Sequence, residues 1–177
     1  MAVLTSAAAP AVARILWIDA ARGVAIVAMV IYHGAFDLVL FGFADWPVAS
    51  HPAWRSFAAG IASTFLFIAG IGLVIAHGDG VRWRAFLRRL AMIGAAAAAV
   101  TIATALAMPA PIYFGILHAI ATFSVLALPF VFVPAFVTLA VAAAVLALPF
   151  LWRHPAFEAP WGYPFGLAPV DPFTFDY

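Results

Sequence analysis

Long apolar stretches, each about the length of a membrane span, are the feature that most constrains this sequence. A spanning helix needs roughly 20 mostly apolar residues, and residues 23–43, 56–76 and 90–108 meet that length. Residues 112–128 and 134–152 are two further candidates, separated by a short link flanked by prolines. The sequence therefore predicts an all-α integral membrane protein, a bundle of about five transmembrane helices in contact with the lipid bilayer.

The composition excludes several other classes of protein. Of 177 residues, 68% are hydrophobic and only 8% charged, so a water-soluble fold would expose very large apolar patches. The eight basic residues are all arginine, and a net charge of +1 leaves no extended basic surface for a nucleic-acid backbone. We therefore expect no nucleic-acid partner. Because there is no cysteine and no cluster of residues with metal-ligand spacing, we also expect no bound metal.

The positions of the arginines predict the orientation of the bundle. Basic residues in short loops stay on the cytoplasmic side of a membrane, and a cytoplasmic N-terminus places most of the arginines there. The cytoplasmic set is Arg14, Arg22, Arg82, Arg84, Arg88 and Arg89, and the outer set is Arg55 and Arg153. Residues 1–152 then form the transmembrane bundle, and residues 153–177, rich in proline and aromatic side chains, form an interfacial tail on the outer side.

The first span carries four polar side chains that a membrane normally excludes, namely Asp19, Arg22, His33 and Asp37. At about 100 degrees per residue they fall within an arc of roughly 60 degrees, and they extend over about 27 Å of helix. Ionisable groups that face lipid cost about 3 kcal/mol or more, so we predict that this stripe faces the interior. The spacings of three and four residues allow an Asp19–Arg22 pair and a His33–Asp37 pair.

Two interpretations of these pairs are open. Both pairs can simply lock helix packing, and for Asp19 and Arg22 this is at least as good as a functional role. For His33 and Asp37 we favour function, with the carboxylate orienting the imidazole and raising its basicity.

Three further candidates lie outside the stripe. His118 in the fourth span either faces the same cavity as His33 or makes a hydrogen bond to a neighbouring helix. His51, in the outer loop before Pro52, is either a general base or acyl acceptor, or a plain loop histidine. The third candidate is the arginine cluster Arg82, Arg84, Arg88 and Arg89. It can hold the phosphates of a nucleotide cofactor or of lipid headgroups, although the topology alone also explains it.

Several short motifs resemble one known family. These are Trp17–Ile26 with the pattern Asp-x-x-Arg-Gly, Met29–Asp37, Phe65–Gly70, Arg88–Leu90 and Ile112–His118. In order and spacing they resemble the transmembrane acyltransferases related to heparan-alpha-glucosaminide N-acetyltransferase, and in particular the bacterial branch. Members of that family continue with more spans beyond a region like residues 171–177. The resemblance therefore implies either a relative shortened at its C-terminus or a longer protein whose remaining part is absent from this sequence.

The resemblance implies an activity and a location. Characterised members move an acetyl group from cytoplasmic acetyl-CoA to a sugar amine or hydroxyl on the far side of the membrane. It implies that Asp19 and Arg22 lie at the cytoplasmic mouth where CoA enters, that His33 lines the channel, and that His51 matches the essential loop histidine of the animal enzyme. A bacterial inner-membrane protein is expected.

Our leading hypothesis is a membrane acyltransferase that uses acetyl-CoA or another acyl-CoA and a sugar-type acceptor. His51 or His33 is the catalytic base, Asp37 orients His33, and the donor contacts Asp19, Arg22, Arg88, Arg89 and His118. The main alternative is a non-catalytic accessory subunit of a larger membrane complex or homo-oligomer. A proton-coupled transporter that uses His33 and Asp37 is less well supported, because the sequence has no repeated halves.

Overall fold

The computed structural model describes residues 15–107, 112–158, 162 and 167–169. Arg14 and most of the predicted tail lie outside the described residues. Over the described part, the chain forms five α-helices and two short 3₁₀ helices, which confirms the predicted all-helical fold. They are α1 (Leu16–Leu40), α2 (Pro52–His77), α3 (Trp83–Ala107), α4 (Ile116–Ala127), η1 (Leu128–Phe132), α5 (Ala135–Leu151) and η2 (Pro155–Glu158).

The first three helices are long enough to cross a membrane. They contain 25, 26 and 25 residues and are strongly apolar, whereas α4 with η1, and α5, are shorter apolar helices. Helix α1 starts at Leu16 rather than at residue 23, so the helix is longer than its uncharged apolar stretch and includes Asp19 and Arg22. These lengths and compositions make the chain an integral membrane protein.

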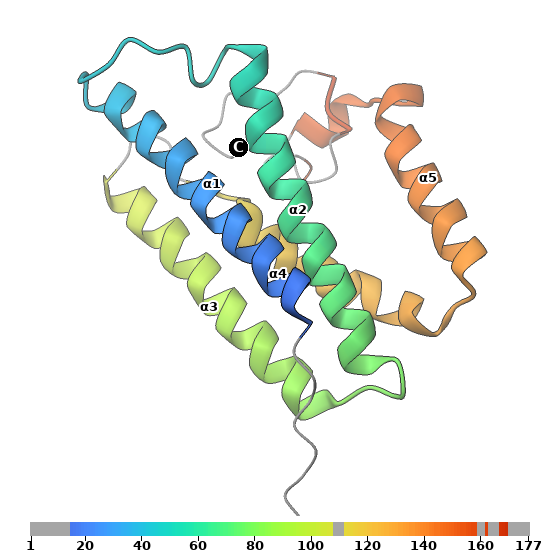
Figure 1. Cartoon of the computed structure of the whole chain (residues 1–177). Coiled ribbons are helices and arrows are strands. Elements are labelled where there is room, and N and C mark those ends of the chain that lie inside the picture. The colour runs from blue at the N-terminus through green and yellow to red at the C-terminus, as the bar shows by residue number, and fades with distance from the viewer. Residues whose placement is uncertain (1–14, 108–111, 159–161, 163–166, 170–177) are drawn as a thin grey trace, which may run out of the picture.

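The helices of the bundle run alternately in opposite directions (Figure 1). At one end α1 and α3 begin and α2 ends, and we call this the arginine end. It carries Arg22, Arg82, Arg84, Arg88 and Arg89. We call the other end, where residues 41–51 connect α1 to α2, the loop end. Helix α4 contacts both α2 and α3, so that these three helices surround the interior described below.

A short connection fixes α3 relative to α2 at the arginine end. His77 is buried at the end of α2, and its Nδ1 accepts a hydrogen bond from the backbone N–H of Arg82 at 3.2 Å. Arg82 Nε donates to the carbonyl oxygen of Ala76 at 3.1 Å. Between these contacts Gly80 adopts a φ of 132°, which side-chain-bearing residues rarely adopt. We call these two hydrogen bonds the clasp, and they hold the start of α3 close to the end of α2.

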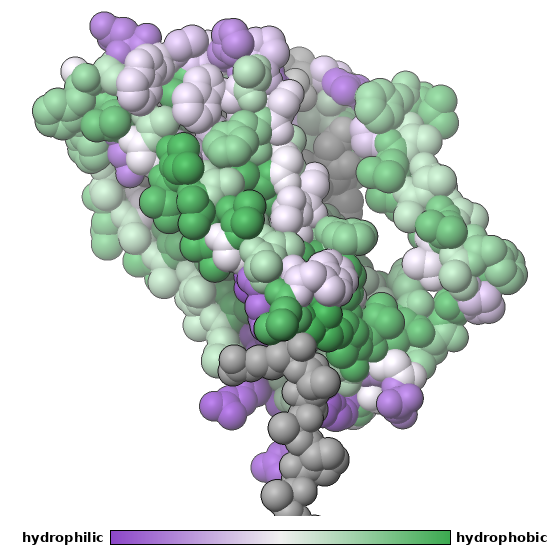
Figure 2. Space-filling view, in the orientation of Figure 1, coloured by the Kyte–Doolittle hydropathy of each residue, from purple (hydrophilic) through white to green (hydrophobic). Residues whose placement is uncertain are grey.

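The described residues include few buried side chains, and some of the buried ones form two clusters. The cluster at the loop end consists of Tyr32, Ala35 and Val48, and the cluster at the arginine end consists of Leu73, Phe86 and Leu128. Most other large apolar side chains are exposed (Figure 2), as expected for helices whose outer faces contact lipid tails.

Helix α5 stands apart from the other four. No residue of α5 is buried, and Figure 2 shows open space between it and the rest of the bundle from this side. Because η1 and the residues after Leu151 connect it to the bundle only at its ends, α5 leaves apolar side chains such as Phe136, Leu146 and Phe150 exposed.

Candidate active site

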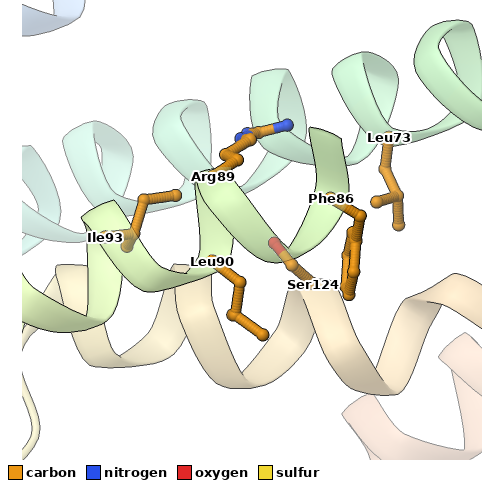
Figure 3. Close-up of a pocket in the computed structure, with 6 residues that line it drawn as sticks. All are labelled: Leu73, Phe86, Arg89, Leu90, Ile93 and Ser124. Atoms are coloured by element: carbon orange, nitrogen blue, oxygen red, sulfur yellow. The ribbon is translucent and has the colours of Figure 1, made fainter. Parts of the chain in front are cut away.

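Three cavities follow one another along the contact between α2 and α4, which we call the seam. The first, at the arginine end, has a volume of about 10 Å³, and we call it the neck (Figure 3). It is lined by Leu73, Phe86, Arg89, Leu90, Ile93 and Ser124. The second, the central cavity, measures about 120 Å³. It is lined by Leu66, Ala69, Gly70, Leu73, Ile120, Phe123, Ser124 and Ala127. Leu73 and Ser124 line both, so the two cavities adjoin.

The third cavity contains His33 and measures about 40 Å³. We call it the His33 cavity, and its lining is Met29, Tyr32, His33, Ala58, Ile61, Ala62, Phe65 and Ile116. Phe65 is adjacent to Leu66 in α2, and Ile116 lies one helical turn from Ile120 in α4. The His33 cavity is therefore the neighbouring cavity toward the loop end, although it shares no lining residue with the central cavity and is separate from it. We call the three cavities together, from Arg89 to His33, the series.

Arg89 places a half-buried guanidinium at the start of this series. A β-carbon built at Gly72 would lie 3.7 Å from Arg89 Nη1, so the guanidinium of this α3 residue rests against α2. It is close enough to Arg22 of α1 for the two positive charges to interact. Among the described residues Arg89 has no carboxylate partner, so an anion at this position would neutralise its charge.

The predicted Asp19–Arg22 pair is present at the arginine end. Arg22 Nη1 lies 3.3 Å from Asp19 Oδ1, and both side chains are about half exposed. Arg88 is exposed on α3, in contrast to its partly buried neighbour Arg89. The positive-inside rule does not distinguish these two adjacent arginines, because it counts charges without regard to the helix face on which they lie.

The predicted interior stripe on α1 is not observed as a buried surface. Asp19, Arg22, His33 and Asp37 are all exposed, and only His33 lines one of the three cavities along the seam. Between His33 and Asp37 the described structure contains no hydrogen bond. The two carboxylates each lie within one turn of an end of α1, where water or headgroups can solvate them, so burial is unnecessary.

His118 faces α3 rather than the His33 cavity. The hydroxyl of Thr101 donates to the carbonyl oxygen of Ile112 at 2.8 Å, so its oxygen is left to accept from His118 Nε2 at 3.2 Å. This assigns the proton of a neutral imidazole to Nε2 and leaves Nδ1, which is buried, without a partner in the described structure. The geometry corresponds to the structural interpretation, in which His118 joins two helices.

The remaining histidines differ in what their ring nitrogens do. Nδ1 of His51 accepts the backbone N–H of Ala53 at 3.2 Å, which makes His51 the N-cap of α2. Nδ1 atoms of His77 and His154 accept backbone N–H groups in the same way. A neutral imidazole that accepts through Nδ1 carries its proton on Nε2 and has no second lone pair to act as a base. His33 makes no such bond in the described structure, so the lone pair of its unprotonated ring nitrogen is not used by another group.

Two further observations concern metal ligands and a groove outside the seam. Among the described residues no group of three potential metal ligands is found. At the loop end an open apolar groove of about 580 Å³ lies along the second half of α1. This loop-end groove is lined by Val30, Ile31, Gly34, Ala35, Leu38, Trp46, Pro47 and Trp54. Neither this groove nor Ser124 was predicted from the sequence. The groove depends on how α1, the loop and α2 pack together, and a serine in an apolar helix carries no distinctive pattern.

Comparison with known proteins identifies the family. The family model described as heparan-alpha-glucosaminide N-acetyltransferase, catalytic, matches residues 14–177, which is nearly the whole chain. Searches among curated proteins and among solved structures found no match. The expectation drawn from the sequence motifs is confirmed, and this chain, an acetyltransferase-like membrane protein, belongs to the heparan-alpha-glucosaminide N-acetyltransferase catalytic-domain family.

Proposed function

We propose that the protein transfers an acetyl or other short acyl group from cytoplasmic acyl-CoA to a sugar-type acceptor on the outer side of a bacterial inner membrane. The observation that supports this most directly is the series of cavities along the seam, with a half-buried cation at one end and His33 at the other. The two ends offer the chemistry that a phosphorylated donor and an acyl transfer require.

At the arginine end, Arg89 and Arg22 bind the phosphates of the donor. Guanidinium groups bind phosphate through paired, charge-assisted hydrogen bonds, and a phosphate between them also relieves their mutual repulsion. Asp19 holds Arg22 in place at 3.3 Å, and Arg88 adds positive charge nearby. The positive-inside rule places this end in the cytoplasm, where CoA is found.

The distance between the two ends suits such a donor. Arg22 and His33 are 11 positions apart on α1, which corresponds to about 16 Å along the helix axis, and an extended pantetheine arm can span this distance. The neck, at about 10 Å³, has room for about one water molecule, so the arm enters only when the side chains that line the neck move apart. The thioester then reaches the level of His33, in a cavity of about 40 Å³ that fits a small acyl group.

At that level His33 is the proton acceptor. It removes the proton from the acceptor amine or hydroxyl as that group attacks the thioester carbonyl, the C–S bond breaks, and the CoA thiolate takes up a proton on leaving. A positioned base of this kind contributes about 10² to 10⁴ in rate. Asp37, one turn further on the same face of α1, stabilises the imidazolium by its negative charge. His118 does not contact the donor; its bond to Thr101 holds α4 in position against α3.

The first test measures acetyl transfer from labelled acetyl-CoA to a panel of sugars and amino sugars by the purified protein in lipid nanodiscs. His33→Ala should lower kcat by about 100-fold or more. The matched control, His154→Ala, removes an exposed histidine after α5 and should leave transfer unchanged. Wild-type turnover by His33→Ala would remove His33 from the mechanism.

The second test measures stabilisation of the protein by CoA in a thermal unfolding assay. Arg89→Met should weaken CoA binding by roughly 10- to 100-fold, because hydrogen bonds to a charged group are lost. Arg84→Met, at an exposed position on the same helix, should have little effect. A wild-type protein whose unfolding temperature does not respond to CoA would contradict the proposed donor.

A non-catalytic accessory subunit is the second candidate, and one observation favours it. Helix α5 buries none of its residues, so a larger membrane partner has an apolar surface to contact. Purification from native membranes distinguishes the two functions. Stoichiometric recovery with a large partner, together with no stabilisation by CoA, would favour the accessory subunit over the enzyme.

A further inference from the structure

We propose that Ser124 is a positioning residue for the donor, and that its hydroxyl oxygen accepts a hydrogen bond from an amide N–H of the pantetheine arm. This inference rests on the proposed function. Ser124 lies on α4 where the neck meets the central cavity, and it lines both. Figure 3 shows its side chain among residues of α2 and α3, on the side of α4 that faces Phe86 and Leu90.

The hydrogen bonding of Ser124 determines what it can bind. Its Oγ donates to the carbonyl oxygen of Ile120 at 2.6 Å, the usual bond of a helical serine to the residue four positions earlier. A hydroxyl has one proton and two acceptor lone pairs, so Ser124 has only acceptor capacity left. A ligand beside it must therefore supply a donor, and an anionic or carbonyl oxygen would find no partner there.

The rest of the central cavity is apolar. Apart from Ser124, its walls consist of alanine, leucine, isoleucine and phenylalanine side chains and the backbone at Gly70. The ligand segment in this position must be largely hydrocarbon with an occasional N–H group. The pantetheine arm has this pattern, because short methylene segments separate its two amide groups, and each amide supplies one N–H donor.

Gly70 forms part of the wall of the central cavity on the α2 side. A β-carbon at Gly70 would meet no heavy atom within 4 Å, so a larger side chain can extend from this position without first displacing a neighbour. Leucine at this position would occupy much of a cavity of about 120 Å³. Gly60, on the same helix, is equally free of neighbours within 4 Å but is not among the residues that line the cavity, so it provides a matched control.

The experiment measures KM and kcat for acetyl-CoA, and the stabilisation of the protein by CoA, in a set of variants. Ser124→Ala should raise KM about three- to tenfold, the effect of one lost hydrogen bond, and leave kcat nearly unchanged. Ser124→Thr keeps the hydroxyl and should restore most of the affinity. Thr122→Ala, at an exposed position of α4, should behave as the wild type.

The blocking variant tests the route itself. Gly70→Leu should abolish stabilisation by CoA, whereas Gly60→Leu should not. If Gly70→Leu does not fold, as judged by its unfolding without CoA, the Ser124 variants decide the question alone. Stabilisation of the wild type together with unchanged KM in Ser124→Ala would overturn this inference and leave the proposed function intact. A wild type that CoA does not stabilise would instead overturn the proposed function.

Discussion

The two ends of the bundle are built differently. At the arginine end, Leu73 and Phe86 are 3% and 5% exposed, and the cavity between them is only about 10 Å³. At the loop end, the groove beside Trp46 and Trp54 is about 580 Å³ and open to the surroundings. A closed, charged end selects its ligand by shape and charge, whereas an open apolar end with tryptophans at its rim can contact lipid or varied molecules from the side. The contrast is consistent with the proposed function, in which one fixed donor meets a more variable acceptor.

Matched phenylalanine substitutions test this contrast with the largest expected effect. Phe86→Ala at the arginine end should lower the free energy of unfolding by roughly 3–5 kcal/mol, because it removes a buried ring from the contact of α2, α3 and η1. Phe57→Ala at the loop end, where the ring is 37% exposed, should cost clearly less. Denaturant unfolding in detergent measures both values, and equal losses would break the comparison.

His51 sharpens the comparison at the loop end. His51→Ala should destabilise the protein by about 1 kcal/mol through the loss of the α2 cap, and His51→Asn should restore most of that stability because asparagine caps helices well. If His51 only caps, acetyl transfer by His51→Asn stays near the wild-type rate. Loss of transfer in a stable His51→Asn protein would return His51 to the role of base.

The smallest effects should come from the two carboxylates of α1, and they should differ in sign. Asp19→Asn removes an exposed ion pair near the positive end of the helix dipole, and should lower stability by at most about 1 kcal/mol. Asp37→Asn removes a negative charge near the negative end, and should raise stability by a few tenths of a kcal/mol. Thermal unfolding at low and high salt measures both changes, since salt should reduce each of them. Changes of the same sign would show that other charges dominate.

The helices were predictable from sequence because membrane insertion imposes length and apolarity on each span. The pair Asp19–Arg22 was predictable because a spacing of three residues brings side chains together on a helix. The orientation of the stripe was not, since periodicity shows that His33 and Asp37 share a face but not which neighbour covers it. That depends on the contacts between helices.

The residues that matter most for the proposed donor site, Arg89 and Ser124, could not be singled out from the sequence, because their roles also depend on contacts between helices. Arg89 and Arg88 are adjacent in the sequence, yet only Arg89 turns into the contact between α2 and α3. Ser124 is of interest only because it lines two adjoining cavities, and these form only when the helices pack together. His51 did carry a readable signal, a side chain able to cap followed by proline at the first position of a helix.

The clasp between His77 and Arg82 has a consequence for how this protein can change. Arg89 follows it by two turns of α3, so the bond between His77 and Arg82 anchors the end of α3 that holds the guanidinium against Gly72. An inserted residue that breaks this bond would loosen that end of α3 and, with it, the position of the cation at the neck. The surface connection is therefore part of the support of a cation in the interior of the bundle, and we expect insertions there to be tolerated less well than its exposure suggests.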